Sequence, residues 1–246
     1  MEPRWISVFI DQPVSLFDEG TRFWAAVTGS SASPRRGGSD EFATLLPEAG
    51  DAFCRVQATA DGSAGVHVDF HVDSVSDAAA EAEERGATVV QDLGHVVMRS
   101  PAGLTFCLVT HNGEHLIPPP VGRPARALDQ ICIDIPAARF DEEVRFWREL
   151  LGWADLPVGR PEFHRLVEPD GLPLRLLFQR LGSDDGATSV SAHLDIAAGE
   201  DRETIAAQHV ALGATRLAEF DRWIVMRDPV GLEYCVTGRS QRLTPA

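Results

Sequence analysis

Residues 133–152 read IDIPAARFDEEVRFWRELLG and residues 10–29 read IDQPVSLFDEGTRFWAAVTG, so one pattern occurs twice in this chain with an offset of 123 residues. Further matches follow in the same order: His67-x-Asp69 with His193-x-Asp195, Gly86-Ala87-Thr88 with Gly213-Ala214-Thr215, and residues 97–107 with 225–235. The offset drifts only between these segments, where loops tolerate insertions. The chain is therefore predicted to be a tandem duplication.

The duplication predicts how the 246 residues divide into domains of ordinary size. We expect a first domain over residues 1–112, a linker over 113–127, a second domain over 128–238 and a polar tail over 239–246. The linker contains the three consecutive prolines Pro118–Pro120, which favour a stiff, extended chain.

Composition excludes several classes of function. The formal net charge is −15, and so acidic a surface repels phosphate backbones, so no nucleic-acid partner is expected. No apolar run approaches the roughly 20 residues that cross a bilayer, and the chain does not open on a basic segment followed by an apolar one. We therefore expect a cytoplasmic protein without a membrane partner, whose four well-separated cysteines stay reduced.

Each repeat begins with a half-buried strand followed by an amphipathic helix. Residues 5–11 and 130–135 alternate between apolar and mixed positions, which is typical of a strand. Pro13 or Pro136 ends this strand, and Phe140, Val144, Trp147 and Leu151 then recur at helical spacing. Gly29 and Gly152 stand where a helix C-cap belongs.

The same pattern restarts at residues 66–72, where Val66, Val68, Phe70 and Val72 alternate with His67, Asp69 and His71. Each repeat is thus predicted to contain two βαβββ modules. The fold class is α+β: in each repeat the modules form a curved mixed sheet, with the helices outside. The opposite, mixed polar and apolar face is predicted to line a cavity, which we call a cup.

These features resemble the vicinal oxygen chelate superfamily, which includes glyoxalase I, bleomycin-resistance proteins and extradiol dioxygenases. The resemblance covers nearly the whole chain, once per repeat. Its carriers are the strand–Pro–helix entry that ends in Arg-Phe-Trp…Gly, the helix that ends in Gly-Ala-Thr, and the turn Asp228-Pro229-Val230-Gly231, in which the first repeat has Ser100 for the Asp. This fold hosts many chemistries, so the resemblance predicts the fold better than the activity.

In metal-dependent members of that superfamily, the ligands lie on the opening and final strands of the modules. The resemblance therefore implies ligand-binding positions at Ser7, Gln57, His67 and Cys107 in the first repeat and at Gln130, Gln179, His193 and Cys235 in the second. The usual set is His, Gln and Glu, and here a cysteine replaces the Glu both times. A catalytic divalent ion generally takes about three protein ligands, with a carboxylate or several imidazoles among them. No metal or other cofactor is therefore predicted, and a divalent metal on Gln130, Gln179 and His193 is kept as the alternative.

His67 and His193 are the catalytic candidates, together with Asp69 and Asp195 two residues further along the same strand face. A carboxylate beside a histidine orients the imidazole and raises its basicity. The alternative is that each histidine only hydrogen-bonds within a polar sheet face, since duplication alone accounts for the recurrence.

The expected function is binding of a small organic molecule by a glyoxalase-like protein without a conventional metal triad. Such a protein either sequesters its ligand, as bleomycin-resistance proteins do, or acts as a lyase or isomerase. The rival hypothesis is a metal-dependent lyase or dioxygenase-like enzyme that uses the second cup, and a third is a structural or regulatory module with filled cups. The two repeats are expected to pair as separate protomers do, which gives a pseudo-dimeric monomer or a homodimer.

Overall fold

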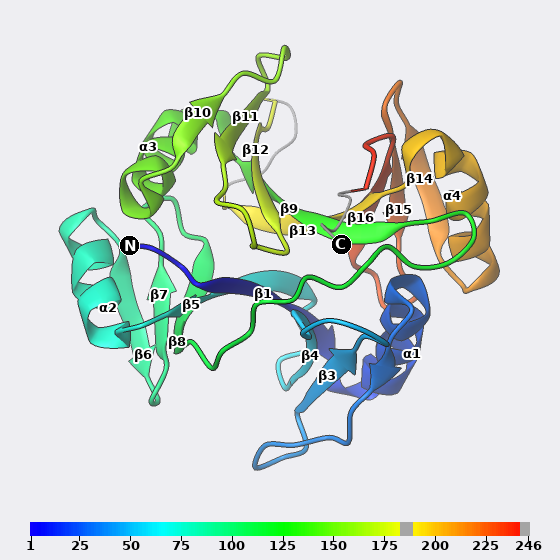
Figure 1. The fold of residues 1–246 in the computed structure, drawn as a ribbon, viewed down its shortest axis with the longest axis horizontal. Helices are drawn as coiled ribbons and strands as arrows, with labels where there is room; N and C mark the ends of the chain where they lie inside the picture. Colours follow the sequence, from blue (N-terminus) through cyan, green and yellow to red (C-terminus); the bar gives the residue numbers. More distant parts are fainter. Residues whose placement is uncertain (183–188, 242–246) are drawn as a thin grey trace. The chain divides into compact units, whose positions relative to one another are not determined.

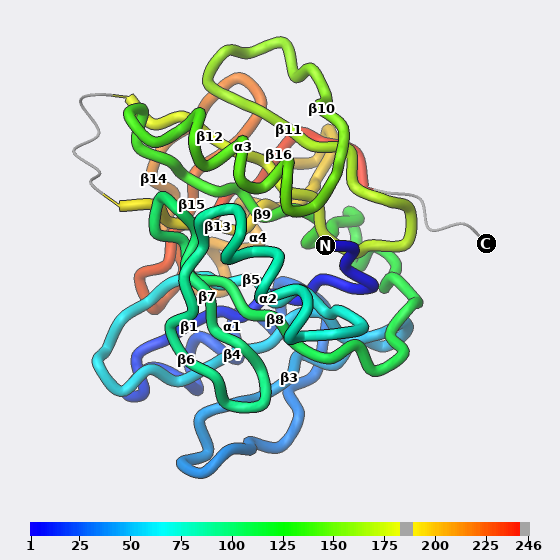
Figure 2. Tube along the Cα trace, turned by 90° about the vertical axis from the view of Figure 1, so that its left-hand side faces the viewer, coloured from blue at the N-terminus to red at the C-terminus, as the bar shows by residue number. Residues whose placement is uncertain are grey.

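The computed structural model describes residues 1–182 and 189–241. Residues 183–188 and 242–246, grey in Figure 2, lie outside this description, and with them the last five residues of the predicted polar tail.

The first repeat consists of two βαβββ modules, as predicted (Figure 1). A single 3-10 turn, Val14–Leu16, separates its first strand from its first helix. In chain order the elements are β1 (Trp5–Pro13), α1 (Phe17–Thr28), β2 (Ser31–Ala32), β3 (Phe42–Leu46), β4 (Cys54–Thr59), β5 (Gly65–Val72), α2 (Val75–Glu84), β6 (Thr88–Asp92), β7 (Val96–Arg99) and β8 (Thr105–Thr110).

The second repeat has the same element order among its described residues. Single 3-10 turns, Ala137–Arg139 and Gly199–Asp201, precede its two helices. The elements are β9 (Ala127–Ile135), α3 (Phe140–Leu151), β10 (Ala154–Leu156), β11 (Phe163–Val167), β12 (Arg175–Arg180), β13 (Ser191–Ala197), α4 (Arg202–Ala211), β14 (Thr215–Glu219), β15 (Trp223–Arg227) and β16 (Glu233–Thr237).

Each repeat contributes one eight-stranded mixed sheet, which confirms the predicted fold class. The hydrogen-bonded orders are β2-β3-β4-β1-β5-β8-β7-β6 and β10-β11-β12-β9-β13-β16-β15-β14. Strands β1 and β4, β5 and β8, and β13 and β16 run parallel, while the hairpins β3-β4, β7-β8 and β15-β16 are antiparallel.

By compactness, the chain divides into two units that each draw on both repeats. Unit 1 comprises Met1–Ser7, His67–His115 and Ile131–Ala192, and unit 2 comprises Val8–Val66, Leu116–Gln130 and His193–Ala246. Unit 1 therefore joins the second module of the first repeat to the first module of the second repeat. Unit 2 joins the remaining two modules.

The aromatic core of unit 1 is built from both repeats. Trp147 on α3 is fully buried, with its ring centroid 5.5 Å from Phe70 on β5 and 5.0 Å from Phe106 on β8. Phe146 packs edge-on against Trp147, with the centroids 5.0 Å apart. The apolar stripe that the sequence places on α3 is thus covered in part by strands of the other repeat.

The core of unit 2 repeats this arrangement with the repeats exchanged. Trp24 and Phe23 on α1 lie 5.2 and 5.9 Å, centroid to centroid, from Tyr234 on β16. The hydroxyl of Tyr234 is 3.0 Å from Nδ1 of His209, a fully buried residue of α4. Burial, together with the nearby charge of Arg126, lowers the pKa of His209 to about 4, so this histidine is neutral at neutral pH.

The buried indoles of Trp24 and Trp147 donate to carboxylates that come from different kinds of element, a turn in unit 2 and a helix in unit 1. In unit 2, Trp24 Nε1 donates to Oδ2 of Asp228 at 2.8 Å, and Oδ1 of Asp228 accepts the backbone N–H groups of Val230 and Leu232. In unit 1, Trp147 Nε1 donates to Oε1 of Glu143 at 2.8 Å, and Oε2 of Glu143 accepts the N–H of Ala102. Burial raises the pKa of both Asp228 and Glu143.

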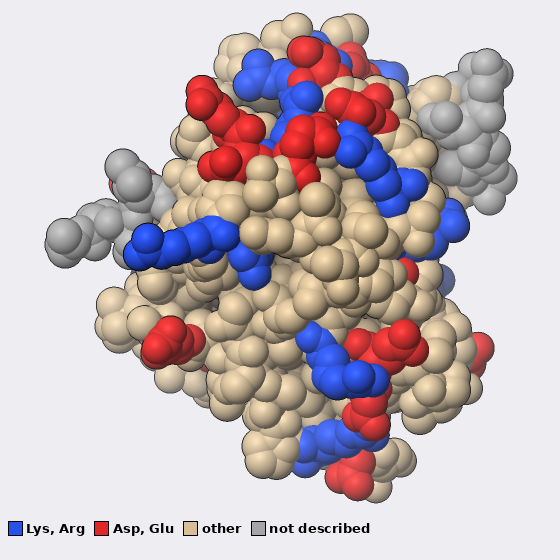
Figure 3. Space-filling view, turned by 90° about the vertical axis from the view of Figure 1, so that its right-hand side faces the viewer, with Lys and Arg blue, Asp and Glu red and all other residues tan. Residues whose placement is uncertain are grey.

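The face drawn in Figure 3 carries interspersed basic and acidic side chains separated by uncharged surface. Ion pairs of this kind include Arg216 with Glu203 and with Glu219, at 2.9 and 2.5 Å. Among the described residues, no helix combines the length and the hydropathy that crossing a bilayer requires.

Candidate functional site

His193, Asp195 and Cys235 come together in unit 2 because β13 and β16 are neighbouring parallel strands. The register pairs Asp195 directly with Cys235. His193 precedes Asp195 by two residues, so the two side chains share one face of β13. Asp195 and Cys235 are buried, and the side chain of His193 is 16% exposed.

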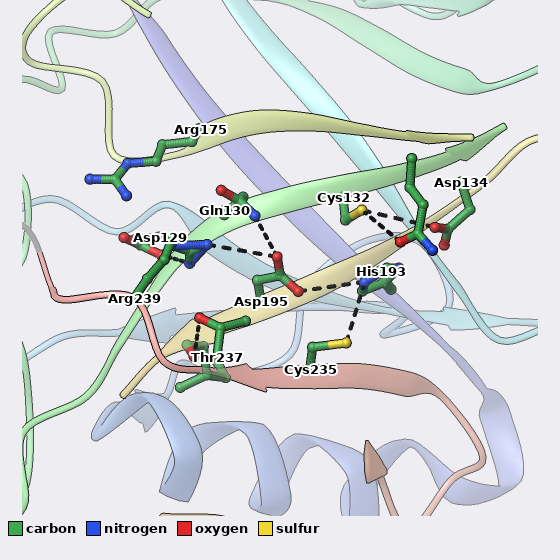
Figure 4. Close-up of polar contacts among 12 residues, drawn as sticks. Asp129, Gln130, Cys132, Asp134, Arg175, His193, Asp195, Cys235, Thr237 and Arg239 are labelled. Atoms are coloured by element: carbon green, nitrogen blue, oxygen red, sulfur yellow. Dashed lines mark hydrogen bonds and ion pairs between the residues drawn. The ribbon is translucent and has the colours of Figure 1, made fainter. Parts of the chain in front are cut away.

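The imidazole of His193 lies between the carboxylate and the thiol (Figure 4). Its Nε2 is 3.5 Å from Oδ1 of Asp195 and 3.6 Å from Sγ of Cys235. A nucleophilic triad uses the two ring nitrogens for two different partners. Here one nitrogen faces both, and it cannot accept from the thiol while it donates to the carboxylate. The geometry therefore does not match a Cys–His–Asp relay.

Asp195 is held from its other side by residues of the same unit. Gln130 on β9, itself buried, donates its Nε2 to Oδ2 of Asp195 at 2.5 Å. Arg239 places Nη1 3.8 Å from that oxygen and donates Nη2 to Oδ1 of Asp129 at 2.5 Å. The guanidinium thus serves two buried carboxylates at once.

These neighbours keep Asp195 ionised despite its burial. Burial by itself raises the pKa of Asp195, whereas the hydrogen bond and charge of His193, the charge of Arg239 and the Gln130 amide lower it. The net effect is a pKa below the ordinary value for aspartate. Unit 2 therefore contains a buried, negatively charged oxygen pair beside a partly exposed imidazole.

The first repeat has the equivalent cluster in unit 1. Asp69 on β5 pairs in register with Cys107 on β8, and Nε2 of His67 is 3.8 Å from Oδ1 of Asp69. Ligand atoms of all three residues lie within 4.8 Å of one another, as they do for His193, Asp195 and Cys235. Ser7, which occupies the position of Gln130, instead places its Oγ 2.8 Å from Nε2 of His71.

The other predicted ligand positions join neither cluster within its unit. Gln57 lies in unit 2, where β4 pairs it in register with Asp11 on β1. Gln179 lies in unit 1, where its Oε1 is 3.6 Å from the thiol of Cys132. Of the eight predicted ligand residues, unit 2 brings together Gln130, His193 and Cys235, and unit 1 brings together His67 and Cys107.

Sequence reasoning missed Asp129 and Arg239. Arg239 is the first residue of the segment predicted to be a polar tail, yet it reaches both Asp129 and Asp195. A signal existed, because Asp129 follows Leu128 at the start of a buried strand and a buried carboxylate needs a cationic partner.

Comparison with known proteins agrees with the repeat structure. A family model described as a glyoxalase-like domain matches residues 7–109 and 130–237. Among curated proteins, none matches this chain.

Solved structures share the fold across almost the full length of the chain. The 2,2',3-trihydroxybiphenyl 1,2-dioxygenase of Sphingomonas wittichii strain RW1 has a TM-score of 0.66 at 13% identity, covering 100% of this chain and 93% of its own. A 4-hydroxymandelate synthase mutant from Streptomyces coelicolor has a TM-score of 0.62 at 14% identity, and the match covers 99% of this chain and 95% of the synthase. The Mn(II)-bound glyoxalase from Novosphingobium aromaticivorans has a TM-score of 0.61 at 15% identity, and the match covers 100% of this chain and 87% of the glyoxalase. At such identities the likeness concerns the fold alone.

Proposed function

Because both repeats of this chain belong to the glyoxalase-like domain family, we propose that the protein binds a small organic molecule through the His193 cluster of unit 2. The cluster consists of His193, Asp195, Gln130 and Cys235. The first-repeat cluster around His67 is the second candidate position for the same kind of ligand.

The observation that carries the proposal is the buried, ionised carboxylate of Asp195. Proteins rarely bury a charged group unless it is paired, and the arrangement here fixes its orientation through Gln130 and Arg239. Oriented polar groups in an otherwise apolar setting are typical of ligand sites. The imidazole of His193, 16% exposed, is the member of the cluster that an incoming molecule can contact.

Turnover by a lyase or isomerase mechanism would use the same pair of residues. His193 would remove a proton from the ligand and return it at another position, and Asp195 would stabilise the imidazolium formed between the two steps. Covalent catalysis by Cys235 fits less well, because the thiol and the carboxylate face the same ring nitrogen. Sequestration needs only the binding step.

A metal-dependent lyase or dioxygenase-like enzyme is the second candidate, and one observation favours it. His193, Asp195 and Cys235 each offer one ligand atom, and these three atoms lie within 4.8 Å of one another. A nitrogen, a carboxylate oxygen and a thiolate suit Zn²⁺ better than Mg²⁺ or Mn²⁺. The predicted set of Gln130, Gln179 and His193 fits less well, since it offers a divalent ion no anionic ligand. When bound, the ion would polarise a ligand oxygen as a Lewis acid.

Metal analysis combined with ligand screening tests the proposal. The purified full-length protein, His193→Ala and the matched first-repeat variant His67→Ala are analysed for metal content. Each is then screened by NMR against carbonyl and phenolic compounds, starting with 2,2',3-trihydroxybiphenyl and 4-hydroxymandelate. If binding is independent of metal, His193→Ala and Asp195→Asn should each lower the affinity for a detected ligand by about tenfold or more, which corresponds to about 1.4 kcal/mol. The metal content of the protein should stay unchanged.

Two outcomes decide against that reading. The loss of one equivalent of metal in His193→Ala but not in His67→Ala would establish the metal-dependent alternative. Ligand binding that is insensitive to His193→Ala, Asp195→Asn and His67→Ala would reject both clusters as binding sites.

A further inference from the structure

Three potential metal ligands that belong to neither of these clusters meet in unit 1. His71 is the penultimate residue of β5, His111 follows the end of β8, and Glu114 lies three residues further on. Nδ1 of His71 is 3.7 Å from Oε1 of Glu114, and Nδ1 of His111 is 3.4 Å from Oε2 of Glu114. Each imidazole thus faces a different oxygen of one carboxylate.

The backbone holds this arrangement in place. Strands β5 and β8 are parallel, with Val72 opposite Thr110, and the N–H of His111 donates to the carbonyl of Val72 at 3.0 Å. The N–H of Asn112 donates to Oε2 of Glu114 at 3.0 Å, which turns the carboxylate back toward the strand ends. Two strand ends and one tight turn therefore fix all three side chains.

The spacing of the ligand atoms is that of a coordination shell rather than of hydrogen bonds. An imidazolium that pairs with a carboxylate approaches to about 2.7–2.9 Å, whereas the distances here are 3.4 and 3.7 Å. Within the described part of the chain, Nδ1 of His111 is shielded from solvent and makes no hydrogen bond. Ligands at about 2.0–2.1 Å from a tetrahedral Zn²⁺ ion are themselves about 3.3 Å apart.

Ser7 supplies a supporting contact of the kind metal-binding histidines use. Its Oγ lies 2.8 Å from Nε2 of His71, and both residues are buried. When Nε2–H donates to the serine oxygen, the lone pair of His71 is on Nδ1, which faces Glu114. Such contacts to the second ring nitrogen orient metal ligands and raise their basicity.

Gene duplication does not account for this group. Counting from the matched pairs Asp69/Asp195 and Cys107/Cys235, the second repeat has Ala197 in place of His71 and Arg239 in place of His111. The three ligands are therefore particular to the first repeat. They also differ from the positions that the resemblance to the vicinal oxygen chelate superfamily implies.

We propose that His71, His111 and Glu114 form a zinc-binding site with one coordination position open to a further ligand. Two imidazole nitrogens and one carboxylate oxygen are a ligand set that selects Zn²⁺ over Mg²⁺ and Ca²⁺. The side chains of His111 and Glu114 are 21% and 18% exposed, which leaves the ion a route of entry. The site does not depend on the proposed function of the His193 cluster.

Zn²⁺ titration of the chelator-stripped, full-length protein against a chromophoric chelator tests the site. The measurement is made in a His67→Ala/His193→Ala background, which removes the imidazoles of the other two clusters. We expect one equivalent of Zn²⁺, an affinity at least about 100-fold weaker in His111→Ala and in Glu114→Gln, and one about tenfold weaker in Ser7→Ala. His115→Ala is the matched control, because that exposed histidine lies close by in the chain, has its Nδ1 beside the Gly113 carbonyl and is not one of the three clustered ligands, so its loss should leave the affinity unchanged.

Replacement of Zn²⁺ by Co²⁺ separates this site from one that contains cysteine. Nitrogen and oxygen ligands give tetrahedral d–d absorption without a thiolate charge-transfer band, and the d–d signal should vanish in Glu114→Gln. An affinity that survives both His111→Ala and Glu114→Gln would overturn the proposal. So would a thiolate band accompanying the bound equivalent, or an absence of Zn²⁺ binding in the folded background protein.

Discussion

Trp24 and Trp147 occupy equivalent places in the two repeats, and each needs a buried acceptor for its indole N–H. In unit 2 the acceptor comes from a turn, as Asp228, and in unit 1 it comes from the helix, as Glu143. The residues at the exchanged positions are Ser100 and Gly20. Each core thus keeps a carboxylate under its tryptophan, although the residue that supplies it has changed.

Moving the carboxylate in unit 1 from the helix to the turn tests whether one acceptor replaces the other. Glu143→Ala leaves the buried Trp147 N–H and the part-buried Ala102 N–H without their acceptor, so we expect a loss of about 2–3 kcal/mol in the free energy of unfolding. Adding Ser100→Asp to that variant should recover part of the loss, because the turn then presents a carboxylate as in unit 2. Ser100→Asp alone should be destabilising, because it places a second carboxylate beside Glu143. Urea denaturation measures all three.

The exposed neighbour Glu142 serves as the control for this series. It pairs with Arg139 at the surface, so Glu142→Ala should change stability by less than about 0.5 kcal/mol. Equal destabilisation by Glu143→Ala with and without Ser100→Asp would contradict the compensation.

The pairing of His193 with Asp195 in the candidate site was predictable from the sequence, but the contacts that hold Asp195 in place were not. Alternation within one strand is enough to place His193 and Asp195 on a common face. The hydrogen bond from Gln130 and the ion pairs of Arg239 join residues from distant parts of the chain, so only the strand order reveals them. The exchange of Asp228 for Glu143 was readable as two opposite changes between the repeats, but the sequence does not show that the two positions contact one tryptophan each.

Among the elements, the strands and helices follow from local patterns and match the predicted order. The helix ends are the clearest case, since Gly29 and Gly152 have φ values of 62° and 67° directly after α1 and α3. What packs against each element was not predictable. The stripe on α3 shows that one side is buried, but not that Phe70 and Phe106 of the other repeat cover it.

The two capping glycines should respond unequally to alanine. At Gly152 an added Cβ meets nothing within 4 Å, so Gly152→Ala should cost only the left-handed backbone strain, about 1 kcal/mol. At Gly29 the new Cβ would lie 2.9 Å from Cβ of Val121, so Gly29→Ala should cost clearly more. Urea denaturation of both variants measures the difference. Equal losses in the free energy of unfolding would contradict this prediction, because they would show that the segment around Val121 shifts to admit the new Cβ without loss of stability.

At the scale of the whole molecule, both aromatic cores are shared between the repeats. Trp147 of the second repeat contacts Phe70 and Phe106 of the first, and Trp24 of the first contacts Tyr234 and Asp228 of the second. Neither repeat therefore contains all the residues of a core, although each contains a complete set of strands and helices.

Splitting the chain within Pro118–Pro120 tests that interdependence. The fragments 1–119 and 120–246, prepared separately, should lack cooperative unfolding as monomers. Mixed together, they should form a 1:1 complex with the near-UV circular dichroism of the intact protein and a midpoint that rises with concentration. A dilute single fragment that unfolds cooperatively as a monomer in sedimentation and denaturation experiments would contradict this.

Because of the linker, the stability of the intact chain does not depend on the protein concentration in the way expected for the two fragments. Holding the partners on one polypeptide turns their association into an intramolecular event, with an effective concentration of the order of millimolar for a short connection. A cell that makes only a few copies of the molecule would still have every copy assembled, whereas a two-chain version would come apart as its abundance fell. Dilution therefore dissociates an ordinary dimer but does not separate the two repeats of this protein.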